Sequence, residues 1–131
     1  TSGTNCIAQH ATIAALEAPV SNIDYMVKEF HKRRDMVLKL LKEIDGFKLN
    51  VPDGAFYVFP NVSAYFRKTI AGTKIENASD FSMLLLEKAN VATVTGDAFG
   101  APKSIRISYA ASEKELREAI RRIKEVLARL T

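Results

Sequence analysis

The chain has 131 residues, of which 47% are hydrophobic and 26% charged, a size and composition that suit one domain with a single core. Cys6 is its single cysteine, so an intrachain disulfide is excluded and a reducing, cytoplasmic setting is favoured. No apolar run reaches bilayer length and no secretory leader is recognisable. The chain begins with Thr1 rather than Met, so we expect a processed protein or a fragment of a larger one.

The first third of the sequence predicts two helices. Residues 7–17 are alanine-rich with apolar residues at helical spacing, and Pro19 stops them. Ser21 or Asn22 can cap a second, long helix that ends at Gly46. The residues of this helix that we expect to face the core are Ile23, Met26, Phe30, Val37, Leu40, Leu41 and Ile44.

Two strands are predicted next, at 47–51 and 55–59, joined by the strong turn signal Pro-Asp-Gly at 52–54. The second strand, AFYVF, is apolar at every position, which predicts that both of its faces are covered. A polar connection follows over 63–77, with one helical turn around 64–67.

The remaining elements alternate between helix and strand. Asn77 or Ser79 begins a helix that runs to residue 88, and strands are predicted at 91–95 and 104–109 with a two-glycine loop between them. The sequence Ser-Glu-Lys-Glu at 112–115 fits a capping box. It opens a closing helix with an apolar stripe formed by Leu116, Ile120, Ile123 and Leu127.

The order of these elements predicts an α+β fold, in which helices pack mainly on one face of a small mixed or antiparallel sheet. We expect the first helix to sit apart from this core, because Pro19 interrupts the chain. The net charge of +4 suggests nucleic acid as a partner, but the placement of the basic residues argues against it. Basic residues alternate with glutamates over 113–125, which is typical of a solvated helix face. We therefore expect neither nucleic acid nor a membrane as partner.

The last predicted strand, KSIRISYA, contains an unusual residue. Ile105 and Ile107 point to one face, so Arg106 lies on the other face between Ser104 and Ser108. Strand propensity and burial do not favour an arginine there. Its side chain therefore faces solvent, forms an internal salt bridge, or binds a ligand. A carboxylate would suit its planar fork of donors, although spacing alone favours a structural role.

Other residues that carry chemistry in proteins are assigned structural roles. Cys6 and His10 can share a helix face, but two ligands do not make a metal site. We expect His31 to be exposed on the long helix, and no orienting third group marks a nucleophilic pair. The loop GDAFGAP lacks the lysine of a phosphate-binding loop. The sequence predicts no metal site.

Four segments in combination resemble one known family. They are TSGTNCIAQHATIAAL, PDGAFYVFP, ANVATVTGDAFG and SIRISYA. In order and spacing they resemble motifs from the C-terminal part of fold type I pyridoxal-phosphate-dependent aminotransferases, especially the bacterial aspartate aminotransferases. The resemblance covers essentially the whole chain. It implies that 21–131 form the small C-terminal domain, while 1–20 come from the side of the large domain and the dimer interface.

The resemblance also implies roles for individual residues. Arg106 matches the arginine that binds the α-carboxylate of the substrate. Phe56 matches an aromatic position that packs near this arginine, with a core phenylalanine as the alternative. Ser2 falls where relatives send residues toward the active site of the partner subunit, which implies a homodimer.

Pyridoxal 5'-phosphate is the implied cofactor, bound mainly by the large domain. The family's Schiff-base lysine typically follows a serine directly, and no lysine in this sequence does. We therefore expect no catalytic residue in this chain, and no activity from the chain alone.

The implied reaction is transfer of an amino group between aspartate and 2-oxoglutarate, that is, between an amino acid and a 2-oxo acid. The alternatives are another amino acid as substrate, or a stand-alone α+β module that senses amino acids. Two departures stand out. Val94-Thr95-Gly96 replaces the Val-Pro-Gly of relatives, which puts the rigidity of the following loop in doubt. Cys6 replaces a serine, and we interpret it as a small packing substitute.

Overall fold

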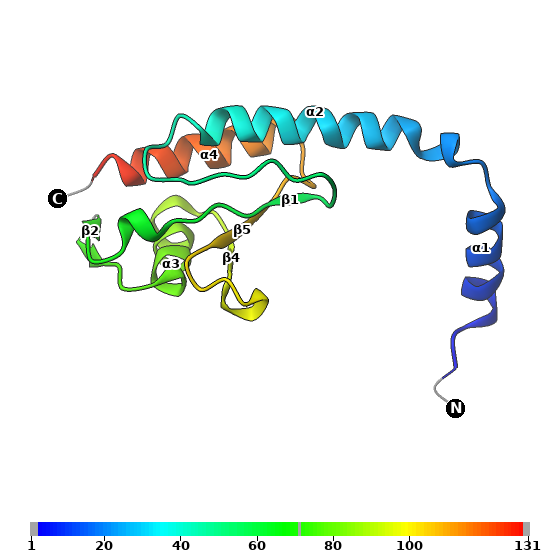
Figure 1. Cartoon of the computed structure of the whole chain (residues 1–131), viewed down its shortest axis with the longest axis horizontal. Coiled ribbons are helices and arrows are strands. Elements are labelled where there is room, and N and C mark those ends of the chain that lie inside the picture. Colours follow the sequence, from blue (N-terminus) through cyan, green and yellow to red (C-terminus); the bar gives the residue numbers. More distant parts are fainter. Residues whose placement is uncertain (1–2, 71, 130–131) are drawn as a thin grey trace.

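The computed structural model describes residues 3–70 and 72–129, which form a body of helices and short strands with one helix projecting from it (Figure 1). The helices are α1 (Cys6–Glu17), α2 (Asp24–Leu41), α3 (Ala78–Ala89) and α4 (Glu113–Leu127). The strands are β1 (Tyr57–Val58), β2 (Thr69–Ile70), β3 (Thr73–Lys74), β4 (Val94–Thr95) and β5 (Ile105–Ser108). Short 3₁₀ turns are η1 (Val20–Ile23), η2 (Ser63–Tyr65) and η3 (Asp97–Phe99).

The sheet is antiparallel and has β5 at its centre. Its strand order is β1-β5-β4, with Tyr57 opposite Ser108 on one side and Val94 opposite Arg106 on the other. The strands β2 and β3 form a separate hairpin. Helices α2 and α3 both contact α4, and α2 also contacts β1. The predicted α+β fold with a small antiparallel sheet is confirmed.

The core lies between the helices and the inner face of this sheet. Ile105 and Ile107 of β5 are 0% and 8% exposed, which matches the alternation predicted for this strand. Burial of such side chains stabilises the fold by about 1.5–3 kcal/mol each. The helices supply many of the other large buried residues, among them Val37, Leu41, Phe81, Leu84, Leu85, Leu116, Ile120 and Ile123.

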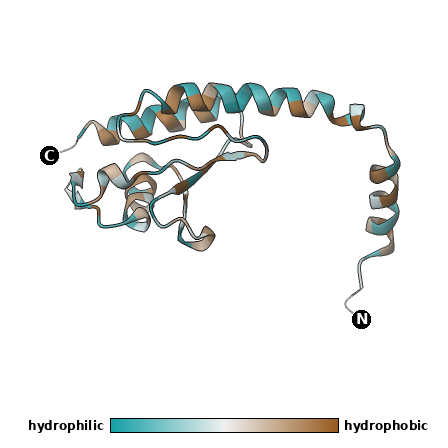
Figure 2. Ribbon diagram, in the orientation of Figure 1, coloured by the Kyte–Doolittle hydropathy of each residue, from teal (hydrophilic) through white to brown (hydrophobic). Residues whose placement is uncertain are grey.

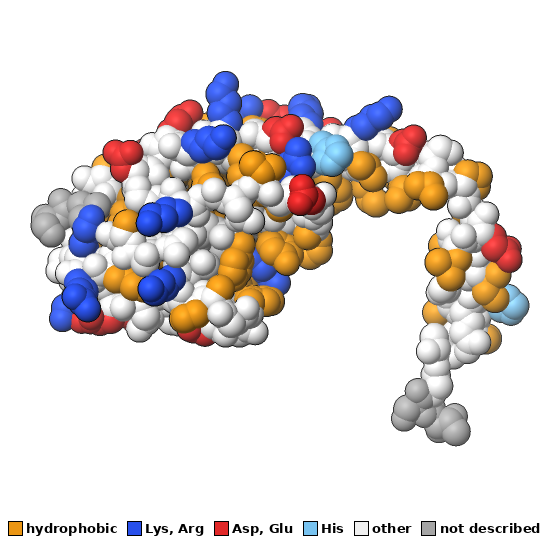
Figure 3. All heavy atoms as spheres, in the orientation of Figure 1, with side chains coloured by type: hydrophobic (Ala, Val, Ile, Leu, Met, Phe, Trp, Pro, Cys, Tyr) orange, Lys and Arg blue, Asp and Glu red, His pale blue; other side chains and the backbone are white. Residues whose placement is uncertain are grey.

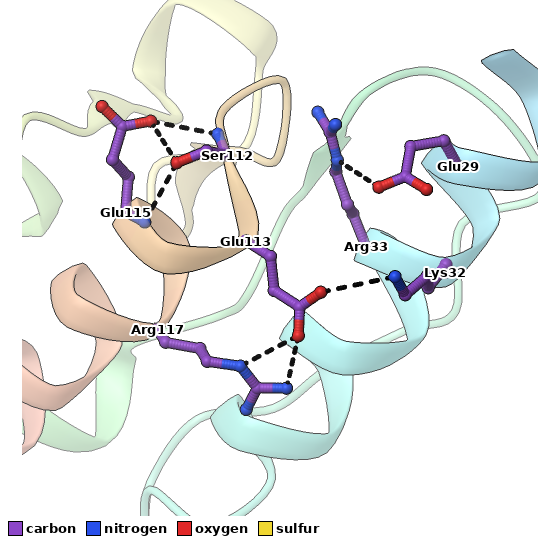
Figure 4. A network of polar contacts seen from close by, with 7 residues as sticks. All are labelled: Glu29, Lys32, Arg33, Ser112, Glu113, Glu115 and Arg117. Carbon is purple, nitrogen blue, oxygen red and sulfur yellow. Dashed lines mark hydrogen bonds and ion pairs between the residues drawn. The ribbon is translucent and has the colours of Figure 1, made fainter.

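The starts of α3 and α4 follow from their capping residues. The Asn77 side chain accepts hydrogen bonds from the backbone amides of Ser79 and Asp80. Ser112 and Glu115 form the predicted capping box, drawn in Figure 4. Figure 4 also shows Lys32 of α2 paired with Glu113 of α4 at 3.5 Å, an exposed link between the two helices.

Helix α1 has no buried residue, and Figure 1 shows it well separated from the body. Ile7 and Leu16 are 74% and 81% exposed, and Figure 2 shows hydrophobic residues recurring along this helix. The side chain of Asn5 caps it by accepting a hydrogen bond from the amide of Ile7. No helix in the described part of the chain is long and apolar enough to cross a bilayer.

The structure corrects the predicted long helix at both ends. Instead of a side-chain cap from Ser21 or Asn22, the turn η1 leads into α2, and no side chain caps its first residue. The helix ends at Leu41, and Gly46 lies in a later turn with φ of +93°. Two residues expected to face the core, Ile23 and Met26, are 46% and 42% exposed. This half of α2 extends beyond the sheet, so its apolar side is left uncovered (Figure 1).

The first two predicted strands are also corrected. Residues 47–51 form no strand and contribute a single bridge, between Lys48 and Asn61. The strand predicted at 55–59 shrinks to β1, because Ala55 adopts a left-handed conformation with φ of +64°. It is not covered on both faces, since Phe56 is 49% exposed. The β2–β3 hairpin, by contrast, falls in the segment predicted to be a polar connection.

Tyr65 of η2 is packed into the core with its hydroxyl satisfied. The residue is 3% exposed, and its ring lies 5.9 Å from that of Phe47 and 5.1 Å from that of Phe81. Its hydroxyl donates a hydrogen bond to the carbonyl of Asp45. Burial, with a smaller effect of the Asp45 charge, raises the pKa of Tyr65 to about 12.

Replacing Tyr65 by phenylalanine should therefore destabilise the fold in a pH-dependent way. At pH 7 we expect a loss of about 1 kcal/mol in the free energy of unfolding, the usual value of one hydrogen bond. Because the folded-state pKa lies above the ordinary value of 10.0, the stabilising neutral phenol is fully present below pH 10 and is lost as the pH rises through about 12.

Urea titrations at pH 7 and between about pH 10 and 12 test this, since the deficit of Tyr65→Phe should shrink over that interval. Tyr25→Phe is the matched control, because Tyr25 is 76% exposed on α2. A deficit that stays constant across the alkaline interval would contradict the prediction.

Candidate functional site

Arg106 is half-buried at the centre of β5, on the face of the sheet opposite its buried isoleucine neighbours. Ion pairs in the described residues occur elsewhere, mainly on α2 and α4, and none involves Arg106. The internal salt bridge considered for this residue is therefore not formed within residues 3–70 and 72–129. The guanidinium keeps its hydrogen-bond donors available for a carboxylate.

Two aromatic rings flank this guanidinium. Its Cζ lies 5.1 Å from the ring centroid of Phe99 and 5.5 Å from that of Tyr57. Such cation–π contacts contribute about 0.5–1 kcal/mol each at exposed sites. Phe99 in turn meets Phe59 edge-on, with ring centroids 5.9 Å apart. The rings restrict where the side chain can swing without using any of its N–H donors.

Phe56 is linked to Arg106 through the ring of Tyr57. Its ring meets that of Tyr57 edge-on, at 5.8 Å between centroids. At 49% exposure Phe56 is not a core phenylalanine, which removes the alternative weighed for it. Ring contacts with the guanidinium come instead from Tyr57 and Phe99, which sequence reasoning missed. The register of β1 on β5 brings Tyr57 there, and a pairing register is not written in either segment alone.

The loop that carries Phe99 is held tightly at its first residue. A Cβ atom on Gly96 would lie 2.2 Å from the carbonyl oxygen of Ala101 and 2.6 Å from that of Ser104, so only glycine fits. The amide of Gly96 donates to Ser104 O at 2.8 Å, and Gly96 O accepts from the amide of Phe99 at 2.9 Å. The short turn η3 therefore starts from a fixed point at the edge of the sheet.

The other candidate residues lie away from Arg106. Cys6 and His10 are both exposed on α1, and no cluster of potential metal ligands exists in the described part of the chain. His31 lines a cavity of about 240 Å³ between α2 and the turn at 52–55. Ser2 lies outside the described residues. A second groove, of about 410 Å³ along α4, does not include Arg106, which stands on an open face.

The lysines do not fit a covalently bound cofactor. All of them are exposed except the half-buried Lys124, which pairs with Glu43 at the end of α4. Imine formation requires a neutral amine, and proteins obtain one by desolvating the lysine in a site. None of the lysines in this chain is buried. The chain thus has an arginine with free donors, but none of its lysines is desolvated enough to hold pyridoxal phosphate as an imine.

Comparison with known proteins places the chain in one family. Residues 4–123 match the family model described as aminotransferase class I and II. The chain is 43% identical over its full length to the aspartate aminotransferase of Rhizobium meliloti strain 1021, of which it covers 32%. It is 44% identical, over 97% of its length, to the bifunctional aspartate aminotransferase and glutamate/aspartate-prephenate aminotransferase of Petunia hybrida, of which it covers 27%.

Solved structures agree with these relatives. The crystal structure of the aspartate aminotransferase from Rhizobium meliloti superposes with a TM-score of 0.92 at 42% identity, covering 100% of this chain and 33% of that one. The alanine aminotransferase from Pyrococcus furiosus gives a TM-score of 0.80 at 30% identity, covering 92% of this chain and 29% of that one. The chain thus spans about a third of the length of these relatives, and it belongs to the class I and II aminotransferase family.

Proposed function

We propose that this chain supplies the wall of an aminotransferase active site that binds the substrate's α-carboxylate, and that Arg106 is the residue that binds it. The observation that carries the proposal is a half-buried arginine, held between two rings, for which the described residues supply no acidic partner. A carboxylate ligand would supply the partner that the described residues do not give this half-buried cation.

The geometry suits orientation rather than proton transfer. A guanidinium fork holds a carboxylate by two parallel hydrogen bonds, which fixes both the position and the rotation of the bound amino acid. Strand β5 sets the direction of this fork, because its isoleucine neighbours are anchored in the core. Tyr57 and Phe99 limit its sideways motion. Arg106 can therefore present a substrate in one orientation to groups outside this chain.

The substrates that we propose are aspartate and 2-oxoglutarate. The aspartate aminotransferases among the relatives support this choice. Arg106 by itself reads only the α-carboxylate that all amino acids share, so the group that reads the side chain lies elsewhere in the enzyme. Another amino acid is the second candidate, which the alanine aminotransferase among the similar structures favours.

Pyridoxal phosphate would be held by a part of the enzyme outside this chain, since no lysine here fits it. We also propose that residues 21–131 form the small domain. Residues 1–20 would contact the rest of the enzyme or a second subunit of a homodimer, with Ser2 reaching the active site of that partner subunit. Figure 3 supports this with apolar side chains on α1 and beneath the first half of α2. Large exposed residues there include Ile7, Leu16, Val20, Ile23, Met26 and Val27. A surface of this kind typically marks an interface.

The chain alone should not bind pyridoxal phosphate at one specific lysine. Incubation with the cofactor, borohydride reduction and peptide mass spectrometry should find sub-stoichiometric adducts spread over exposed lysines such as Lys28 and Lys114. Bovine serum albumin treated in parallel gives the background for such non-specific labelling. One adduct at full stoichiometry on a single lysine would overturn the assignment of the cofactor to another part of the enzyme.

A chimera tests the role of Arg106 directly. This chain replaces the matching third of the Rhizobium meliloti aspartate aminotransferase, to which it is 43% identical. Arg106→Lys keeps the charge but loses one charge-assisted hydrogen bond of about 1.5–3 kcal/mol, so kcat/KM should fall roughly ten- to a hundredfold. In Arg106→Ala, kcat/KM should fall further. The loss should be similar for every amino acid substrate.

The matched control is Arg117→Lys, an exposed arginine on α4 that pairs with Glu113. It should leave both kcat/KM and the melting temperature nearly unchanged. If Arg106 were only structural, Arg106→Lys would lower the melting temperature while the folded enzyme kept near-normal kinetics, and the proposal would fail.

A further inference from the structure

The loop that carries Phe99 is tied to the start of α3 by three polar side chains. Thr95 donates a hydrogen bond from its hydroxyl to Oδ2 of Asp97 at 2.8 Å. The hydroxyl of Ser79 lies 3.3 Å from Thr95 Oγ1 and 3.3 Å from Asp97 Oδ2. These contacts close a triangle between the edge strand β4, the turn η3 and the first turn of α3. We refer to Ser79, Thr95 and Asp97 as the tether.

One side of the tether is firmly fixed. Ser79 follows Asn77, whose side chain accepts hydrogen bonds from the amides of Ser79 at 2.9 Å and Asp80 at 3.0 Å. Ala78 and Phe81 in the same turn are 0% exposed. The start of α3 is therefore held by its cap and by the core, and it serves as a rigid reference for the loop.

The other side of the tether sets the place of Phe99. Asp97 and Phe99 share the turn η3, in which the amide of Gly100 donates to Asp97 O at 3.1 Å. The ring of Phe99 is 51% exposed, so burial does little to hold it. Its ring contacts are with Phe59 and with the guanidinium of Arg106. Beyond the hydrogen bond from the Phe99 amide to Gly96 O, the position of Asp97 thus helps to keep Phe99 against Arg106.

The backbone of Thr95 adds little to this hold. The amides of Ile105 and Tyr109 donate toward the β1 side of the sheet, to Pro60 O and Phe56 O. Because amides alternate in direction along an antiparallel strand, Thr95, which lies opposite Ile105, does not exchange ladder hydrogen bonds with it. Its amide faces the open edge of the sheet. The Thr95 hydroxyl therefore holds the chain at a residue that makes no backbone hydrogen bond to β5.

We propose that Thr95 is a positioning residue for Arg106, acting through Asp97 and Ser79. Its hydroxyl holds the loop so that the ring of Phe99 keeps the guanidinium pointed at the substrate carboxylate. The structural half of this inference is that Thr95 holds Phe99 against Arg106. The functional half is that this contact improves substrate binding, and it rests on the proposed role of Arg106. Without the hydroxyl, Asp97 loses its shortest contact, Phe99 drifts, and Arg106 keeps one flanking ring, that of Tyr57.

The structural half is tested on the chain itself by NMR. Isotope-labelled protein should show cross-relaxation between the ring protons of Phe99 and the side chain of Arg106. Thr95→Val keeps the shape and the strand propensity but removes the hydroxyl, so these signals should weaken or vanish. Thr95→Ser keeps the hydroxyl and should retain them. Ser79→Ala removes the hydroxyl that α3 contributes to the tether, so it should also weaken these signals. It therefore tests the same contact if Thr95→Val fails to fold.

Thr93→Val is the matched control, because the hydroxyl of Thr93 is buried two residues away and has no hydrogen-bond partner in the described part of the chain. It should leave the Phe99–Arg106 signals intact. Unchanged signals in Thr95→Val, or equal losses in Thr93→Val, would overturn the proposal that the tether positions Phe99.

The functional half is measured in the chimera. Loss of one cation–π contact should raise KM for aspartate about two- to fivefold in Thr95→Val while kcat changes little, and Thr95→Ser should restore KM. A normal KM in a variant that has lost the NMR signals would overturn the positioning role. Failure of the proposed function would appear elsewhere, as near-normal kinetics of Arg106→Lys, and would leave the NMR result intact.

Discussion

Strand β5 has to serve two environments at once, and the arrangement of the whole domain follows from that requirement. Ile105 and Ile107 fill the core beneath the helices, so the strand cannot rotate or slip by one residue without exposing both. The same constraint forces Arg106 outward. The anchoring isoleucines and the arginine are thus neighbours in sequence, and the packing energy of the isoleucines determines where the arginine points.

The two neighbouring strands build the surroundings of this arginine. Strand β1 brings Tyr57 to one side of the guanidinium, and the turn after β4 brings Phe99 to the other. Neither strand is longer than two residues, so the sheet contributes register more than stability. Stability comes from the helices, whose buried stripes close the core on the inner face. This division leaves the outer face free to vary in chemistry while the fold stays intact.

Local signals in the sequence were sufficient where a residue acts on its own neighbours. Asn77 and Ser112 mark helix starts through contacts two or three residues away, and the alternation around Arg106 assigns its face. Partners brought in from a distance were not predictable. Tyr57 reaches Arg106 through strand pairing, and residues 47–51 lack a continuous partner although they look like a strand. The exposure of Ile23 and Met26 was unpredictable for the same reason, because no distant segment in the described part of the chain covers them.

Gly96 has a consequence for how such a site can diversify. Because two carbonyl oxygens occupy the space of its Cβ, this position is closed to all other residues while the loop keeps its path. Random variation around the arginine is therefore filtered unevenly: changes at Asp97, Ala98 and Phe99 alter the rim, whereas changes at residue 96 move the backbone. A library that varies this loop without moving its backbone should therefore keep residue 96 constant and place its diversity in the exposed turn that follows.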